Sequence, residues 1–151
     1  MQMSKSSFLI AATIALSLCV SACTPVREQG TSYINDLVKA LNAADAWVDL
    51  LDQGKIEASY SGTAPTLQQK ATLAQWEKDL GVVHEKFGKV TSRKFQAVQA
   101  ATILPPSNIP GKYFVVVYDA RFTTGKKASQ VVSMMWNAGK KAWLVAGYYV
   151  R

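Results

Sequence analysis

The sequence has very few of the side chains from which metal sites and disulfide frameworks are built. Its 151 residues include one histidine and two cysteines, Cys19 and Cys23. A structural zinc site needs four ligands of this kind, and a disulfide framework needs cysteine pairs that stay in the folded chain. We therefore expect no metal, no cofactor and no disulfide in the folded domain.

The sequence also lacks an apolar run of the length that a transmembrane helix needs. The run Phe8–Leu18 has eleven residues and follows Lys5. As a helix it would cover about 16 Å, which is roughly half the thickness of the hydrocarbon core. A short apolar run after a basic residue is typical of a signal peptide, and we expect one over residues 1–22.

The end of this segment, Val20–Cys23, resembles the lipobox of bacterial lipoproteins. The resemblance implies that Cys23 is acylated, becomes the first mature residue and anchors the protein to a membrane of the cell envelope. Thr24 stands where aspartate would retain such proteins in the inner membrane, so we expect the outer membrane, with the protein facing the periplasm. The alternative is an ordinary secretory peptide cleaved near Ala22, with Cys23 left as a free thiol.

Residues 23–32 are polar and include Pro25 and Gly30. We expect them to form a short tether. The remaining residues, 33–151, have the length and composition of one globular domain with one hydrophobic core.

Apolar residues recur at spacings of three and four in two stretches, which predicts two amphipathic helices. The first covers residues 34–52 and stops at Gly54. The second has Thr66 as its N-cap and stops at Gly88. A shorter helix is expected over residues 56–60.

After Gly88 the apolar period changes to two, which is typical of strands. Short turns between successive strands predict an antiparallel meander. The expected fold class is α+β, with N-terminal helices packed on one face of a four-stranded sheet. The predicted strands cover residues 91–104, 112–122, 129–136 and 142–150.

Several segments resemble the family known as domain of unknown function 4019, over about residues 40 to 151. They are residues 43–47, 52–55, 87–93, 110–116 and, most specifically, 139–150. The resemblance implies a small bacterial envelope protein with a fold similar to the NTF2-like and cystatin-like group. It supplies no catalytic residue. Tyr60 stands where the family pattern has tryptophan, and Gln130 where it has glutamate, which weakens the ion pair with Arg93 that the resemblance implies.

Negative charge is scarce in the second half of the chain. Residues 23–89 carry a net charge of −2, whereas residues 90–151 carry +8 with Asp119 as their one acidic residue. An antiparallel meander brings the starts of its first and third strands and the ends of its second and fourth strands to one rim. The cations expected near this rim are Lys86, Lys89, Arg93, Lys126, Lys127 and Arg151.

The cationic rim can be interpreted in two ways. Its cations can bind anionic lipid headgroups, lipid A phosphates or an acidic partner, at about 1 kcal/mol per charge near an anionic surface. The commoner role of such a rim is to solvate strand ends and prevent edge-to-edge association. Nucleic acid is not an expected partner, because no aromatic stacking motif alternates with the lysines.

Catalytic signatures are also lacking. The sequence has no GxSxG, HExxH or phosphate-binding glycine loop. Asp119 alternates onto the strand face opposite the core, Asp52 follows the polar side of the first helix, and His84 adjoins the apolar side of the second. We therefore expect no catalytic residue and no enzyme activity.

The second face of the predicted sheet is more apolar than a solvated face should be, which favours a protein partner or a homodimer through the sheet. The expected function is that of a non-catalytic, lipid-anchored envelope protein that binds a partner or supports envelope structure. The alternative is a pocket between sheet and helices that binds a small or anionic envelope ligand. The residues of this second face are Tyr113, Val115, Val117, Val131, Met135 and Tyr149.

Overall fold

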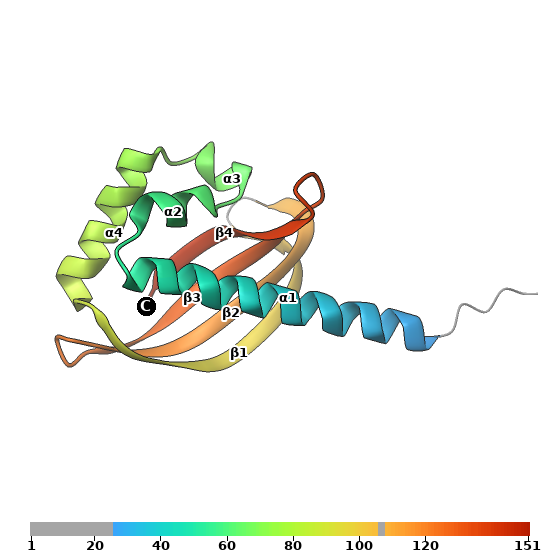
Figure 1. Cartoon of the computed structure of the whole chain (residues 1–151), viewed down its shortest axis with the longest axis horizontal. Coiled ribbons are helices and arrows are strands. Elements are labelled where there is room, and N and C mark those ends of the chain that lie inside the picture. Colours follow the sequence, from blue (N-terminus) through green and yellow to red (C-terminus); the bar gives the residue numbers. More distant parts are fainter. Residues whose placement is uncertain (1–25, 106–107) are drawn as a thin grey trace, which may run out of the picture.

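The computed structural model describes residues 26–105 and 108–151. Along the chain, four helices precede four strands, and together they form the α+β domain that the sequence predicts (Figure 1). No helix in these two ranges is both long enough and apolar enough to cross a membrane. The elements are α1 (Val26–Asp52), α2 (Ile56–Ser61), α3 (Pro65–Gln68), α4 (Leu73–Phe87), β1 (Val90–Leu104), β2 (Ile109–Phe122), β3 (Lys127–Asn137) and β4 (Ala142–Val150).

The four strands pair antiparallel in the order β1-β2-β3-β4, which confirms the predicted meander. At its centre Val116 lies opposite Val98 on one side and Val132 on the other. The predicted core face of β2 is also confirmed, because its alternate residues from Phe114 to Phe122 are all buried. Figure 1 shows the sheet curving around α1, with all four helices on the same side of it.

Helix α1 packs against the sheet through small residues. Ala40 and Ala44 are fully buried, and Trp47 and Val48 continue the same stripe one turn later. Alanine at these positions lets the helix axis approach the strands closely, because no long side chain separates them. The large side chains that fill the core come from the sheet, from the C-terminal half of α1 and, through Trp76, from α4.

Helix α1 begins at Val26, eight residues earlier than the sequence predicts. Residues 26–32 are thus helical, although the boundary between tether and domain stays a prediction. The early start has a physical reason, since Gly30 costs the helix only about 1 kcal/mol and Pro25 stands just before the first turn, where proline does not interrupt the helix. Figure 1 shows this first part of α1 extending beyond the sheet.

The predicted cap of the second long helix was wrong. Thr66 lies inside the short helix α3, and the N-cap of α4 is Thr72, whose hydroxyl accepts a hydrogen bond from the backbone N–H of Gln75 at 3.3 Å. The end of α4 at Gly88 is confirmed. Gly88 has a φ of +78°, and a Cβ at this position would clash with the side chain of Thr123, so the turn into β1 requires glycine.

Two buried tryptophans are joined through one buried serine. The indole N–H of Trp47 donates to the backbone oxygen of Ser59 at 2.8 Å, and that of Trp76 donates to the Ser59 hydroxyl at 3.1 Å. Ser59 is fully buried. Because both indole donors are satisfied, α2 and α4 are fixed against α1 without leaving either of these two N–H groups unpaired.

The second face of the sheet has no described helix over it, but some of its residues are buried. Tyr113 and Val131 are 3% and 1% exposed, whereas Tyr149 is 47% exposed. Homodimerisation through this face stays a prediction.

Candidate functional site

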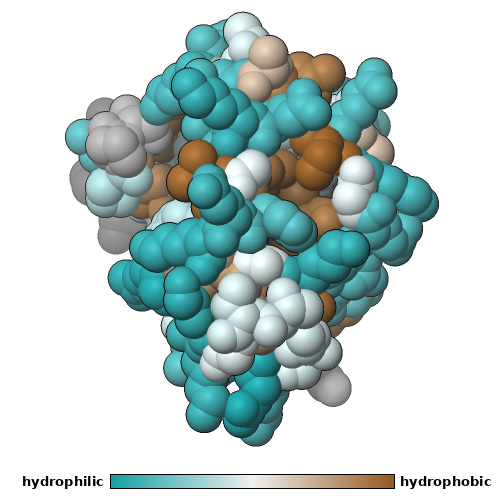
Figure 2. Space-filling view, turned by 90° about the vertical axis from the view of Figure 1, so that its left-hand side faces the viewer, coloured by the Kyte–Doolittle hydropathy of each residue, from teal (hydrophilic) through white to brown (hydrophobic). Residues whose placement is uncertain are grey.

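A cavity of about 400 Å³ lies between the C-terminal end of α1, helix α4 and the sheet. It opens on the left-hand side of Figure 1, and Figure 2 shows that side directly, with apolar surface visible among hydrophilic side chains. The lining comes from α1, the loop to α2, α4, and strands β1 to β4. Helix α1 ends at Asp52 and the chain turns at Gly54, which has a φ of +70°, so α1 does not continue over this part of the sheet.

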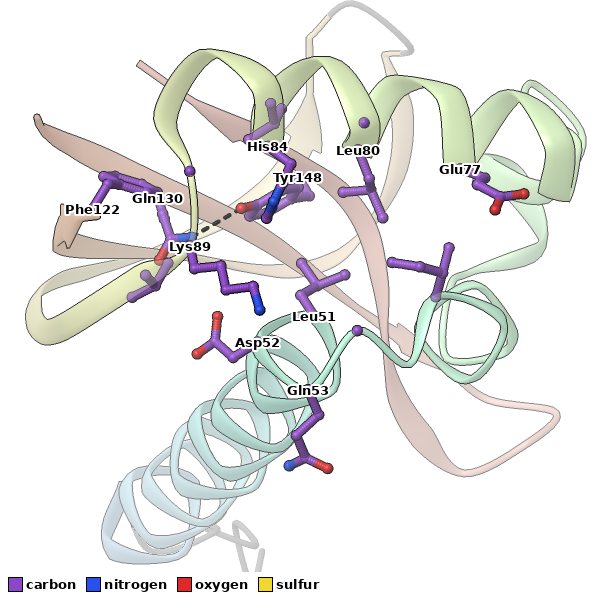
Figure 3. A pocket seen from close by; sticks show the side chains of 16 residues that line it. Leu51, Asp52, Gln53, Glu77, Leu80, His84, Lys89, Phe122, Gln130 and Tyr148 are labelled. Carbon is purple, nitrogen blue, oxygen red and sulfur yellow. Dashed lines mark hydrogen bonds between the residues drawn. The ribbon is translucent and has the colours of Figure 1, made fainter. Parts of the chain in front are cut away.

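The walls of the cavity are mainly apolar. Leu51 from α1 and Leu80 from α4 point into it from opposite sides, and Tyr148 lies behind them (Figure 3). Val83 and Phe122 close the end towards the β2–β3 hairpin. Gly81 also lines the cavity, and a Cβ added to it would meet no atom within 4 Å. Gly81 is exposed, so a larger side chain at this position at the edge of the cavity would meet no steric obstacle close to its Cβ.

A chain of polar contacts crosses one side of the cavity. Both terminal nitrogens of Arg93 donate to the two carboxylate oxygens of Asp52, each at 2.9 Å. Its Nε donates to Oε1 of Gln130 at 2.7 Å, and Nε2 of Gln130 donates to the Tyr148 hydroxyl at 2.9 Å. Because the guanidinium binds the carboxylate with two parallel bonds, Arg93 has little freedom to turn. The network therefore fixes the position of the Tyr148 hydroxyl.

The Tyr148 hydroxyl is set up as a hydrogen-bond donor. Burial raises the pKa of Tyr148 above its usual value, while the bond from Gln130 and the charge of Arg93 lower it in part. The phenol thus keeps its proton at neutral pH. Since the hydroxyl oxygen accepts from Gln130, its proton is free to bind an acceptor that enters the cavity.

Charged side chains are distributed unevenly around the opening. Lys89 and Asp52 lie at one end and Glu77 at the other, with His84 between them along α4 (Figure 3). The Asp52 carboxylate is already paired with Arg93, whereas Lys89 has no carboxylate within 4 Å among the described residues. The amino group of Lys89 therefore has no ion-pair partner among the described residues.

The structure divides the predicted cationic rim into separate groups. Lys86 and Lys126 lie over the ring of Phe87, with their amino groups 5.1 and 5.7 Å from its centre, and Lys126 also donates to the backbone oxygen of Lys86. Lys89 lies at the cavity. Lys127 and Arg151 lie on the opposite face of the sheet.

Arg93 is the rim residue whose role differs most from the prediction. Its side chain is 12% exposed, and its donors are bound to Asp52 and Gln130. Arg93 therefore contributes to the internal network and has no free charge to offer an anionic surface. The contact between positions 93 and 130 that the family resemblance implied is present as a hydrogen bond, and Asp52 supplies the ion pair.

Sequence periodicity missed most of the cavity. Asp52 was assigned to the polar side of its helix and His84 to a position beside the apolar side of its own, neither with a role in a site, and both line the cavity. Gln130 and Tyr148 were not singled out as site residues. A glutamine at a buried strand position, with a tyrosine on the neighbouring strand, was a signal that could have found them, because a buried amide group needs a hydrogen-bond partner. Cys23, the predicted lipidation site, lies outside the described residues. No group of three metal-ligating side chains occurs within the described residues.

The fold and the cavity define an α+β domain with a ligand-sized space between its helices and the concave side of an antiparallel sheet. Residues 43–148 match the protein family described as "Protein of unknown function (DUF4019)", and the chain belongs to this family. Every residue that lines the cavity lies within the matched segment. Comparisons with curated proteins and with solved structures gave no match. The likeness to NTF2-like and cystatin-like folds stays a prediction.

Proposed function

We propose that this protein is a non-catalytic, lipid-anchored envelope protein whose domain binds a small amphiphilic ligand in the cavity. The observation that carries the proposal is the cavity itself, with its apolar walls and its polar groups gathered along one side. Its volume of about 400 Å³ falls in the range of pockets that bind small molecules. This geometry favours the pocket, which was the alternative expected from the sequence, over the partner binding that was expected first.

The lining indicates the chemistry of the ligand. Apolar side chains such as Leu51, Leu80 and Val83 suit an apolar body. The Tyr148 hydroxyl can donate a hydrogen bond, and the positive charge of Lys89 favours an anionic head at the same end. We therefore assign the ligand as an amphiphile with an acidic head and an apolar body.

The hydrogen bonds of Asp52 and the exposure of His84 support a non-catalytic function. Both carboxylate oxygens of Asp52 accept hydrogen bonds from Arg93, so this acid is not free to take a proton from a substrate. His84 is exposed and lies beside the opening (Figure 3). Neither group forms the pair of base and orienting partner that general-base catalysis uses.

The Gly81→Phe variant tests the pocket. The added ring would stand in the open space at Gly81, which lines the cavity, and we expect it to obstruct ligand entry. We expect binding of 8-anilino-1-naphthalenesulfonate, an aromatic amphiphile with one acidic group, to weaken at least tenfold, about 1.4 kcal/mol. Fluorescence titration of the full chain measures this change.

Gly81→Ala is the matched control, because it changes the same helical position and leaves the cavity open. Alanine should raise the free energy of unfolding by about 0.5–1 kcal/mol, as glycine is unfavourable inside a helix. Probe binding should stay as in the unchanged protein. Equal binding by the phenylalanine and alanine variants would show that the probe binds elsewhere and would remove the cavity as the ligand site.

The lipid anchor has its own test. In the Cys23→Ser variant the acylated thiol is replaced, and we expect the protein to move from the membrane fraction to the aqueous fraction of lysed cells. Acyl chains anchor through buried methylene groups at about 0.8 kcal/mol each, so their loss should release nearly all of the protein. A variant that stays with membranes, or a chain that takes up no labelled fatty acid, would contradict the anchor.

A further inference from the structure

The face of the sheet opposite the helices carries a second hollow, of about 760 Å³. Five cationic residues line it. Arg93 is one of them, but its guanidinium is bound to Asp52 and Gln130. The other four come from all four strands or their ends. They form what we call the convex cationic face: Lys94 of β1, Arg121 of β2, Lys127 of β3 and Arg151 after β4. Lys94 and Arg121 were not part of the predicted rim, because their inclusion depends on strand register.

The charges of this face are balanced only in part, by Asp119 of β2, which lies opposite Lys94 of β1. None of its four cations lies within 4 Å of a carboxylate in the described part of the chain, where the ion pairs involve Arg93 and Lys112. Asp119 is the one acidic residue that lines the hollow. The hollow therefore keeps an excess of positive charge, which attracts anions.

One pair of these residues works against the stability of the sheet. Arg121 and Lys127 lie directly opposite each other on β2 and β3. Like charges in such a cross-strand position repel and are unfavourable. A local arrangement that lowers stability, with no structural interaction that compensates for it, is typical of a functional surface.

The face also offers groups that suit phosphate in particular. Two of its cations are arginines, whose planar guanidinium groups bind phosphate oxygens in pairs. Ser92 and Ser129 add hydroxyl groups to the hollow, and the guanidinium of Arg151 lies 5.8 Å from the centre of the Tyr149 ring. Neighbouring strands lie about 4.8 Å apart, so four strands span about 14 Å. A single phosphate is too small to contact all four cations.

We propose that the convex cationic face binds a ligand that carries two or more phosphate groups. This site is separate from the cavity, because the two lie on opposite faces of the sheet. The proposal therefore does not depend on the proposed function. The same chemistry occurs in soluble polyphosphates and in the headgroups of an anionic membrane, and the experiment distinguishes these sources.

The test compares two double variants of the full chain at low ionic strength. Arg121→Glu with Lys127→Glu reverses two charges on the convex cationic face. Lys78→Glu with Lys140→Glu makes the same change in net charge at exposed positions outside it. Calorimetric titration with tripolyphosphate measures the soluble source. Sedimentation with phosphatidylglycerol vesicles, relative to phosphatidylcholine vesicles, measures the membrane source, because any acyl anchor contributes equally to both.

We expect the unchanged protein and the control to bind at least one of the two probes, and the variant of the convex cationic face to bind that probe at least tenfold more weakly. Binding to tripolyphosphate identifies a soluble ligand, and binding to vesicles alone identifies a membrane. The proposal fails if neither probe binds, or if both double variants lose binding equally.

A single variant separates binding from folding. Arg121→Glu places opposite charges across the β2–β3 pair, so its urea midpoint should equal or exceed that of the unchanged protein. Its binding of the probe should nevertheless weaken. A lower midpoint together with weaker binding would show that Arg121 acts on the fold, and would overturn the role proposed for it.

Discussion

Replacing Trp47 by alanine should lower the free energy of unfolding by about 3–5 kcal/mol. Trp47 is 4% exposed and contacts the rings of Trp76 and Tyr148, with ring centres 6.0 and 5.3 Å away. Its removal leaves a cavity between α1, α4 and β4 and takes the donor from the backbone oxygen of Ser59. A domain of this size has a total stability of about 5–15 kcal/mol, so this variant should be close to unfolding.

Urea unfolding, followed by the fluorescence of the remaining tryptophans, measures this effect. Trp47→Phe is the matched control, because it keeps a buried ring and loses only the indole N–H. We expect it to cost about 1–2 kcal/mol, mainly through the lost hydrogen bond. If the alanine and phenylalanine variants unfolded at the same urea concentration, packing around Trp47 would not be the source of stability inferred from the structure.

Arg93→Met should lower the free energy of unfolding by about 2–3 kcal/mol. The change removes three hydrogen bonds and leaves Asp52 and Gln130 without their partner. Asp52 is about one-third exposed, so water can solvate its carboxylate, and this keeps the cost below that of a fully buried ion pair. Freed from Arg93, Gln130 should no longer hold the Tyr148 hydroxyl in place, so binding of the amphiphilic probe should weaken as well.

The chain offers a close control for this prediction. The carboxylate of Asp49 lies 4.0 Å from the same guanidinium, but its side chain is 65% exposed. Asp52→Asn should therefore cost more than 1 kcal/mol, whereas Asp49→Asn should change stability by less than about 0.5 kcal/mol. A double-mutant cycle of Arg93→Met with Asp52→Asn measures the coupling energy directly. A coupling energy near zero would show that this ion pair does not stabilise the domain.

The sequence by itself determined the element types and their order. The four strands and the long helix over 34–52 follow from local periodicity, since the period of apolar residues reports which face of an element is buried. The second long helix was predicted to run from the Thr66 cap to Gly88, whereas the structure divides this stretch into α3 and α4. The end at Gly88 followed from glycine's freedom at positive φ. Thr66 was misassigned as the cap because Thr72 has the same side chain and lies closer to the start of the helix. Residue type alone does not decide which of the two threonines is the N-cap.

Only the tertiary structure decided where the polar groups meet. Arg93, Gln130 and Tyr148 lie far apart in the sequence, and strand register and the end of α1 bring them into one network with Asp52. Periodicity places a residue on a face of its element, but it does not say which other element covers that face or leaves it open. For this reason Asp52 and His84 looked like surface residues, and the cavity beside them became visible only when α1, α4 and the sheet were placed together.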